Sequence, residues 1–169
     1  MENGDFSSDK AVFRTAATRE VGEVSIVEGK SVPGKPLSGD KRVLFVDAKE
    51  AYLSLSYLGG IYVDPSRKYR VKVTAYTPDL LQLDCGGYGY AGKGGETVKS
   101  PDGKKIWQYN LISSPGPTDG WQSFETTIGP EGSDCKTIWD PKIFCIGMAI
   151  WIHRGPGKVW FSDFVVEEF

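Results

Sequence analysis

The stretch IFCIGMAIWIHRGPGKVWFSDFVVEEF, residues 143–169, contains two β-type runs on either side of a turn signal at residues 153–158. Side chains of a strand point alternately to its two faces. In the first run, one set is apolar and the other holds small residues around a single large aromatic, Trp151. The second run places one acid, Asp163, among aromatic and β-branched residues, where an unpaired carboxylate is costly to bury. The whole stretch is predicted to form a β-hairpin.

The rest of the chain has the same kind of pattern. Short runs rich in Val, Ile, Tyr, Phe and Trp recur between Gly, Pro, Asp and Ser clusters, and almost no window has a helical period. The chain is therefore predicted to be all-β, an antiparallel β-sandwich of the jelly-roll, galactose-binding-domain-like type. The predicted strands cover residues 11–15, 23–28, 42–47, 51–57, 61–63, 69–77, 81–85, 106–111, 121–128, 143–153 and 159–166.

Size and charge narrow the function classes. A chain of 169 residues is long enough for one sizeable core, so residues 1–169 are interpreted as a single domain. Its 20 basic and 22 acidic residues do not collect into blocks of one sign, which argues against a nucleic-acid partner. The apolar runs are too short to span a bilayer, so no membrane partner is expected. The opening MENGDFSSDK shows no secretory signal and is consistent with a piece excised from a larger protein.

Few residues are available for metal or nucleophilic chemistry. Three cysteines, Cys85, Cys135 and Cys145, lack C-x-x-C spacing, which argues against a zinc site. Two alternatives stay open for them: a Cys135–Cys145 bridge beside a free thiol, or three buried thiols. The one histidine, His153, has no second imidazole to act with and is interpreted as an exposed residue entering the turn.

Paired carboxylates for glycoside hydrolysis also stay open, because such a pair depends on geometry rather than on sequence spacing. We interpret the acids of the second half mainly as solvated charges. The candidates are Glu125, Asp140, Asp163, Glu167 and Glu168.

Aromatic side chains are the main resource for binding, with five Trp, eight Tyr and eight Phe. Period two in residues 69–77 predicts an inward apolar set and an outward set of Arg70, Lys72, Thr74 and Tyr76. A flat exposed ring beside hydrogen-bonding side chains suits the apolar face of a sugar. Other aromatics are expected in the core, because such residues dominate sandwich interiors: Trp107, Trp121, Phe124 and Trp160.

Long connections on a rigid β scaffold are common binding loops, and three are predicted at residues 29–41, 86–105 and 129–142. The second is rich in glycine and carries Tyr88 and Tyr90, so its backbone is expected to come close to a ligand.

The segment IWQYNLI, residues 106–112, has two possible orientations. It can bury Ile106 and Ile112 and present Gln108 and Asn110, or it can bury the other set, Trp107, Tyr109 and Leu111. The period alone does not choose between them.

Three segments together resemble a known family. They are NGDF near the start, YVDPSRKYRVKVTAYT in the middle, and DGWQSFETTI followed by GKVWFSDFVVEE near the end. Their order and spacing are similar to those of the jelly-roll carbohydrate-binding modules attached to secreted polysaccharide-degrading enzymes, particularly the glucan- and xylan-binding superfamily. The matching residues are Asn3, Gly4, Phe6, Pro65, Tyr69, Trp121, Phe124 and Asp163. The resemblance implies a jelly roll, a polysaccharide or oligosaccharide ligand, a secreted or extracellular location and a catalytic domain in cis.

The resemblance also implies a structural calcium ion. In such modules an acid in the closing strand commonly binds calcium together with the first-strand region, and calcium prefers several oxygen ligands. The implied ligands here are Asp163, Asp5, Ser7 and Gly29. The chain departs from the family pattern at Ser7, where a Glu is common, and at Ser162, where an Asp is common.

Our hypothesis from the sequence is a non-catalytic module that stacks sugars on Tyr76 and Trp151 in a groove on one sheet. Arg70, Lys72, Gln108 and Asn110 would supply hydrogen bonds, and Tyr88 and Tyr90 would add contacts from the glycine-rich connection. The basic pair makes an acidic or sulfated glycan worth testing. Two alternatives are a small jelly-roll glycoside hydrolase or polysaccharide lyase, and an extracellular interaction or adhesion domain. The hypothesis requires the strands of Tyr76 and Trp151 to share a sheet.

Overall fold

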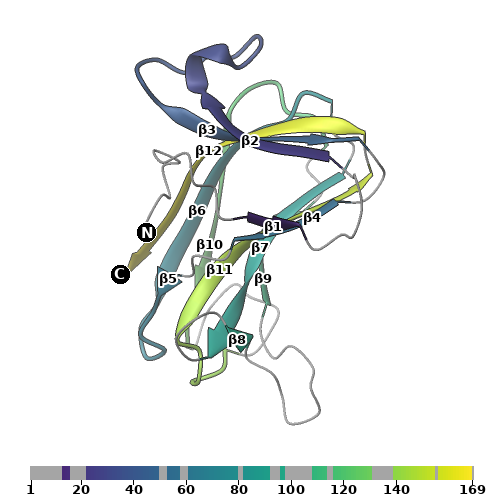
Figure 1. Cartoon of the computed structure of the whole chain (residues 1–169). Coiled ribbons are helices and arrows are strands. Elements are labelled where there is room, and N and C mark those ends of the chain that lie inside the picture. Colours follow the sequence, from purple (N-terminus) through teal and green to yellow (C-terminus); the bar gives the residue numbers. More distant parts are fainter. Residues whose placement is uncertain are drawn as a thin grey trace.

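The computed structural model describes residues 13–15, 22–49, 53–57, 61–79, 82–91, 96–97, 108–113, 116–130, 139–154 and 156–168. This part of the chain forms two antiparallel sheets, which lie as two layers in Figure 1. Its helical content is one 3-10 turn, η1 (Gly29–Ser31), and no helix there is long and apolar enough to cross a membrane. The predicted all-β antiparallel sandwich is confirmed.

The larger sheet has seven strands in the order β1-β4-β11-β7-β8, with β5 pairing β11 and β9 pairing β7. Its strands are β1 (Phe13–Thr15), β4 (Leu53–Tyr57), β5 (Ile61–Tyr62), β7 (Gln82–Ala91), β8 (Glu96–Thr97), β9 (Gln108–Ser113) and β11 (Cys145–Arg154). The smaller sheet has five strands in the order β10-β6-β12-β3-β2. They are β2 (Gly22–Glu28), β3 (Arg42–Ala48), β6 (Tyr69–Tyr76), β10 (Gln122–Ile128) and β12 (Gly157–Glu168).

The predicted hairpin of residues 143–169 is wrong, although both of its strands exist. Strand β11 pairs with β4, β5 and β7, whereas β12 pairs with β3 and β6 in the other sheet. Each strand is central in its own sheet, so both of its edges already bond to strands from distant parts of the sequence. The turn between them therefore carries the chain from one layer to the other.

The glycine-rich start of the predicted loop at residues 86–105 is instead part of β7, which runs to Ala91. A Cβ on Gly86 would lie 1.9 Å from the carbonyl oxygen of Tyr109, and one on Gly87 would lie 1.8 Å from that of Gly147. These two glycines therefore permit the neighbouring strands β9 and β11 to approach closely. Their role in the described structure is strand packing.

The main core lies between the two sheets. The predicted inward set of β6 is confirmed, because Val71, Val73 and Ala75 are fully buried there and Tyr69 is nearly so. From the other layer, β11 contributes the predicted apolar set except for Phe144, which precedes the strand and is exposed. The β11 residues of the core are Ile146, Met148, Ile150 and Ile152.

A second apolar cluster covers part of the outer face of the five-stranded sheet. Four rings follow one another across β3, β12, β6 and the start of β10, and we call them the covered ring row: Phe45, Trp160, Tyr76 and Trp121. Their successive ring centroids are 5.1, 5.7 and 5.9 Å apart. Val32 and Leu37, from the connection between β2 and β3, belong to the same cluster. That connection therefore shields the rings from solvent.

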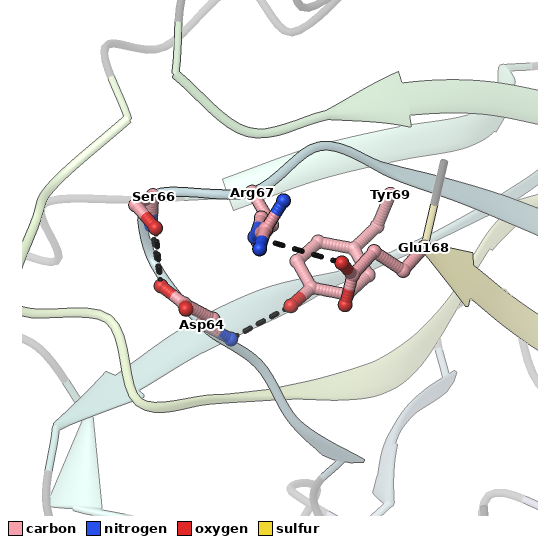
Figure 2. A network of polar contacts seen from close by, with 5 residues as sticks. All are labelled: Asp64, Ser66, Arg67, Tyr69 and Glu168. Carbon is pink, nitrogen blue, oxygen red and sulfur yellow. Dashed lines mark hydrogen bonds and ion pairs between the residues drawn. The ribbon is translucent and has the colours of Figure 1, made fainter.

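The turn between β5 and β6 is fixed by the polar contacts in Figure 2. The Asp64 Oδ1 atom accepts hydrogen bonds from the Ser66 N–H at 2.8 Å and the Ser66 hydroxyl at 2.7 Å. The Tyr69 hydroxyl accepts the Asp64 N–H at 2.7 Å, and Arg67 pairs with Glu168 at 3.6 Å. The Ser66 hydrogen bonds lower the pKa of the Asp64 carboxyl. The turn thus sets where β6 begins.

Candidate functional site

The structure divides the predicted binding residues between two surfaces. Tyr76, Arg70 and Lys72 lie on β6, in the five-stranded sheet. The other predicted residues lie on three strands of the seven-stranded sheet: Trp151, Tyr88, Tyr90, Gln108 and Asn110.

The predicted platform of Tyr76 and Trp151 is therefore not formed. The two strands belong to different sheets, and both side chains are buried, with exposed fractions of 7% and 8%. Tyr76 does lie on the outer side of β6, but Trp121, Trp160 and the connection after β2 cover its ring. The alternation in the sequence predicted the direction of the ring correctly and missed what lies over it.

The outer face of the seven-stranded sheet gathers aromatic rings from neighbouring strands. Opposite positions in this sheet pair Cys145 with Tyr90, Gly147 with Tyr88, and Trp151 with Asp84. The rings of Tyr88 and Trp151 meet edge to face, with centroids 5.4 Å apart. The outward residues that precede Trp151 on β11 are small: Cys145, Gly147 and Ala149. The aromatic side chains therefore project above this part of the sheet.

The same face continues to a tyrosine that the sequence interpretation missed. Tyr62 on β5 lies opposite Cys145, which also lies opposite Tyr90. Its exposed fraction is 65%, and its ring meets that of Phe144 edge to face with centroids 5.1 Å apart. We call the surface around Tyr62, Tyr88, Tyr90 and Trp151 the aromatic face. The sequence signal for Tyr62 was its position next to Ile61. Neighbouring residues of a strand point to opposite faces, and Ile61 packs on the core.

Polar groups border the aromatic face on the side of β9. Asn110 is exposed and lies opposite Gly86, while Gln108 lies opposite Tyr88. A register shift in the β7–β9 pairing explains why neither predicted orientation of this segment is fully correct. It allows Tyr109 and Ile112 to be buried together.

Burial changes the acidity of three groups on β7 and β11. It raises the pKa of Tyr90 to about 12, and the neighbouring Tyr88 and Cys145 act in the same direction. It also raises the pKa of the thiols of Cys85 and Cys145. Both cysteines are free and buried, so the bridge from Cys145 is not formed, and Cys135 lies outside the described residues. Neutral, buried thiols are poor nucleophiles and metal ligands.

The outer face of the five-stranded sheet beside the covered ring row is polar. Arg70 and Lys72 are exposed as predicted, and each lies opposite an acid, Glu167 and Glu125 respectively. At the base of the connection between β2 and β3 is a cavity of about 350 Å³. Most of its lining is charged: Glu28, Lys30, Gly39, Asp40, Lys41 and Arg42. The hydrogen bond that the Lys30 ammonium donates to the Glu28 carboxylate, at 3.0 Å, raises the pKa of Lys30.

Two of the four implied calcium ligands, Asp163 and Gly29, lie close to the same residue, Lys41. The Asp163 carboxylate lies 3.6 Å from the Lys41 ammonium and accepts the Ser162 hydroxyl at 2.7 Å. The Gly29 N–H donates to the Lys41 carbonyl, and the Gly29 carbonyl accepts two backbone N–H groups. Asp5 and Ser7 lie outside the described residues. Calcium therefore stays a prediction.

Groups for catalysis are sparse in the described chain. No three of its His, Cys, Asp and Glu residues come together as a metal site. Two of the candidate acids form ion pairs, Asp163 with Lys41 and Glu168 with Arg67. His153 lies near the end of β11, and its side chain is outside the described part of the structure.

No protein-family model and no curated protein match the sequence. Solved structures match its fold. The enzymatically active domain of tailspike protein 4 from bacteriophage CBA120 has a TM-score of 0.63 and 11% identity, over 100% of this chain and 21% of that chain. The CBM22-1 xylan-binding domain of Paenibacillus barcinonensis Xyn10C gives 0.60 and 9%, over 96% and 88%. TmCBM61 in complex with β-1,4-galactotriose gives 0.58 and 13%, over 100% and 97%.

At these identities the likeness establishes the fold alone. The chain has the jelly-roll fold of carbohydrate-binding modules, as the motifs in the sequence predicted. It spans only about a fifth of the tailspike chain, at 21%, but 88% and 97% of the two binding modules.

Proposed function

We propose that the protein is a non-catalytic carbohydrate-binding module and that the aromatic face binds the glycan. The observation that carries the proposal is the gathering of Tyr62, Tyr88, Tyr90 and Trp151 on one side of one sheet. Two of the structures with the same fold are named for xylan binding and for a bound galactotriose, which supports a sugar ligand.

The physical basis is a combination of stacking and hydrogen bonding. A pyranose ring has apolar C–H faces that pack on an aromatic ring, and its hydroxyls need partners at the rim. Asn110 and Asp84 border the rings and offer an amide and a carboxylate. Affinity should be modest, because association costs several kcal/mol before any contact contributes. As in the resembling family, the module would act outside the cell and beside a catalytic domain in the same protein.

Electrophoresis through gels that contain xylan, galactan or an anionic polysaccharide tests this proposal, after a glycan array has identified the sugar. Tyr88→Ala and Asn110→Ala should weaken the retardation of the protein in the gel. Lys72→Ala is the matched control, because Lys72 is exposed on the other sheet. Weakening by Lys72→Ala alone would assign binding to the other sheet and overturn the proposed face. Binding to no glycan would overturn the function itself.

An assay for new reducing ends or unsaturated products separates this function from a hydrolase or lyase. A binding module releases no product from any polysaccharide. Turnover that is lost on substitution of a carboxylate such as Glu125 would contradict the proposal.

A further inference from the structure

We infer that Tyr62 and Phe144 form an additional sugar contact, so that the aromatic face accommodates several consecutive units of a linear polysaccharide chain rather than a single sugar. The inference rests on the proposed function. The two residues are among the few large apolar side chains exposed in the described structure, at 65% and 38%, and they contact each other. Exposed apolar groups that cluster are typical of interaction sites.

The length of the aromatic face sets the size of the ligand. Tyr62 lies opposite Cys145, and the far end of the face is at Trp151, six residues further along β11. At a rise of about 3.3 Å per residue, the two ends are about 20 Å apart. A monosaccharide or a disaccharide is much shorter than this span. Only an oligosaccharide of several units can extend along the whole face.

The Tyr62 end is fixed in position by the backbone. The Val63 N–H donates to the Phe144 carbonyl at 3.0 Å, and the Phe144 N–H donates to the Tyr90 carbonyl at 2.9 Å. These bonds join the segments that carry Tyr62, Phe144 and Tyr90. Backbone that is already ordered loses little conformational entropy when a ligand binds. Most of the Tyr62 side chain is open to solvent, so the ring is accessible to a sugar.

The aromatic face is open at its Tyr62 end and closed at its Trp151 end. Tyr62 retains 65% of its exposure, whereas Trp151 at the opposite end retains 8%. A polysaccharide can therefore continue past Tyr62 into solvent.

Calorimetric titration with xylo-oligosaccharides and β-1,4-galacto-oligosaccharides, from dimer to hexamer, tests the inference. Wild-type affinity should rise with length until the ligand reaches Tyr62. Tyr62→Ala should leave dimer affinity unchanged and weaken the longest oligomers by roughly tenfold, as expected for the loss of one aromatic contact. Tyr62→Phe should keep the length dependence. Val165→Ala is the matched control, because Val165 is exposed on the other sheet.

The outcomes separate the inference from the proposed function. If Tyr62→Ala binds the longest oligomer as tightly as the wild type, while Tyr88→Ala still weakens binding, the extended contact is wrong and the sugar-binding face stands. Equal weakening of dimer and hexamer by Tyr62→Ala also overturns the extended contact. If the wild type binds none of these oligomers and no glycan on an array, the proposed function fails and the inference fails with it.

Discussion

The indole N–H of Trp121 donates a hydrogen bond to the carbonyl oxygen of Lys35 at 2.8 Å. This bond joins the connection between β2 and β3 to the residue that immediately precedes β10, the strand at the opposite edge of the sheet. The Trp121 ring also lies 5.9 Å from that of Tyr76. The connection and the covered ring row therefore form one structural unit, and the packing of the rings contributes to the stability of the fold.

Replacing Trp121 with Phe tests this hydrogen bond. The variant keeps an aromatic ring beside Tyr76 but loses the donor, so the free energy of unfolding should fall by about 1 kcal/mol. Urea unfolding measures this as a lower midpoint with an unchanged slope. An unchanged midpoint would show that the bond to Lys35 contributes nothing to stability.

Tyr76→Ala separates a structural role from a binding role. Its ring stacks on Trp160 with centroids 5.7 Å apart and is buried, so its removal should lower the free energy of unfolding by about 3 kcal/mol. Tyr76→Phe should cost much less, because it keeps the stacked ring. Sugar affinity of the folded Tyr76→Phe variant should equal that of the wild type. Loss of binding in this variant without loss of stability would return Tyr76 to the binding site.

The sequence predicted the direction of side chains better than their surroundings. In β6 and β11 the alternation of apolar residues is a local property, because it follows from the pleat of a single strand. It assigned Val73 and Ile150 correctly to the core and Tyr76 to the outer side. Whether an outward ring is exposed depends on a distant connection that folds over it, which no local pattern encodes.

Strand pairing was also not predicted correctly from the sequence. Residues 143–169 have the local signature of a hairpin, yet β11 and β12 bond to different sheets. Pairing depends on which strand edges are already occupied, and this is a property of the whole topology. The predicted binding site is wrong for the same reason. The observed pairing separates Trp151 from Tyr76 and places it beside Tyr88.

Acid should weaken the turn at Asp64, with a sign that follows from its pKa. The Ser66 hydrogen bonds hold the folded pKa below the ordinary value of 3.8. The carboxylate therefore contributes stability above the ordinary value, and this contribution is lost as the pH falls through the lower folded value. The side chain at position 64 does not titrate in the Asp64→Asn variant. The difference in unfolding free energy between this variant and the wild type should therefore shrink as the pH falls below the ordinary Asp pKa of 3.8. A constant difference in acid unfolding curves would exclude this contribution.

A calcium ion at Asp163 can be tested by its effect on stability. A ligand that binds only the native state raises Tm, so EDTA should lower Tm and added calcium should restore it. Asp163→Asn should abolish this response. If EDTA leaves the wild-type Tm unchanged and elemental analysis finds no metal, the ion pair with Lys41 is what neutralises Asp163.

Alkaline conditions should weaken the aromatic face through Tyr90. Burial raises its pKa from 10.0 to about 12, so the neutral phenol is favoured in the folded state. Its contribution is complete below the unfolded value of 10.0 and is lost as the pH rises through about 12. Tyr90→Phe cannot ionise, so its stability should decline less steeply over this interval. Denaturant unfolding at a series of alkaline pH values measures both slopes.

The wild type and Tyr90→Phe both contain Cys145, which lies opposite position 90. The raised pKa of the Cys145 thiol acts in the same direction in both proteins, so it cancels in the comparison. The difference between the two slopes therefore belongs to the Tyr90 phenol. Equal slopes would mean that the phenol is as well solvated in the folded protein as in the unfolded chain. The aromatic face would then be open to water at Tyr90, and sugar binding there would displace water from a wet surface.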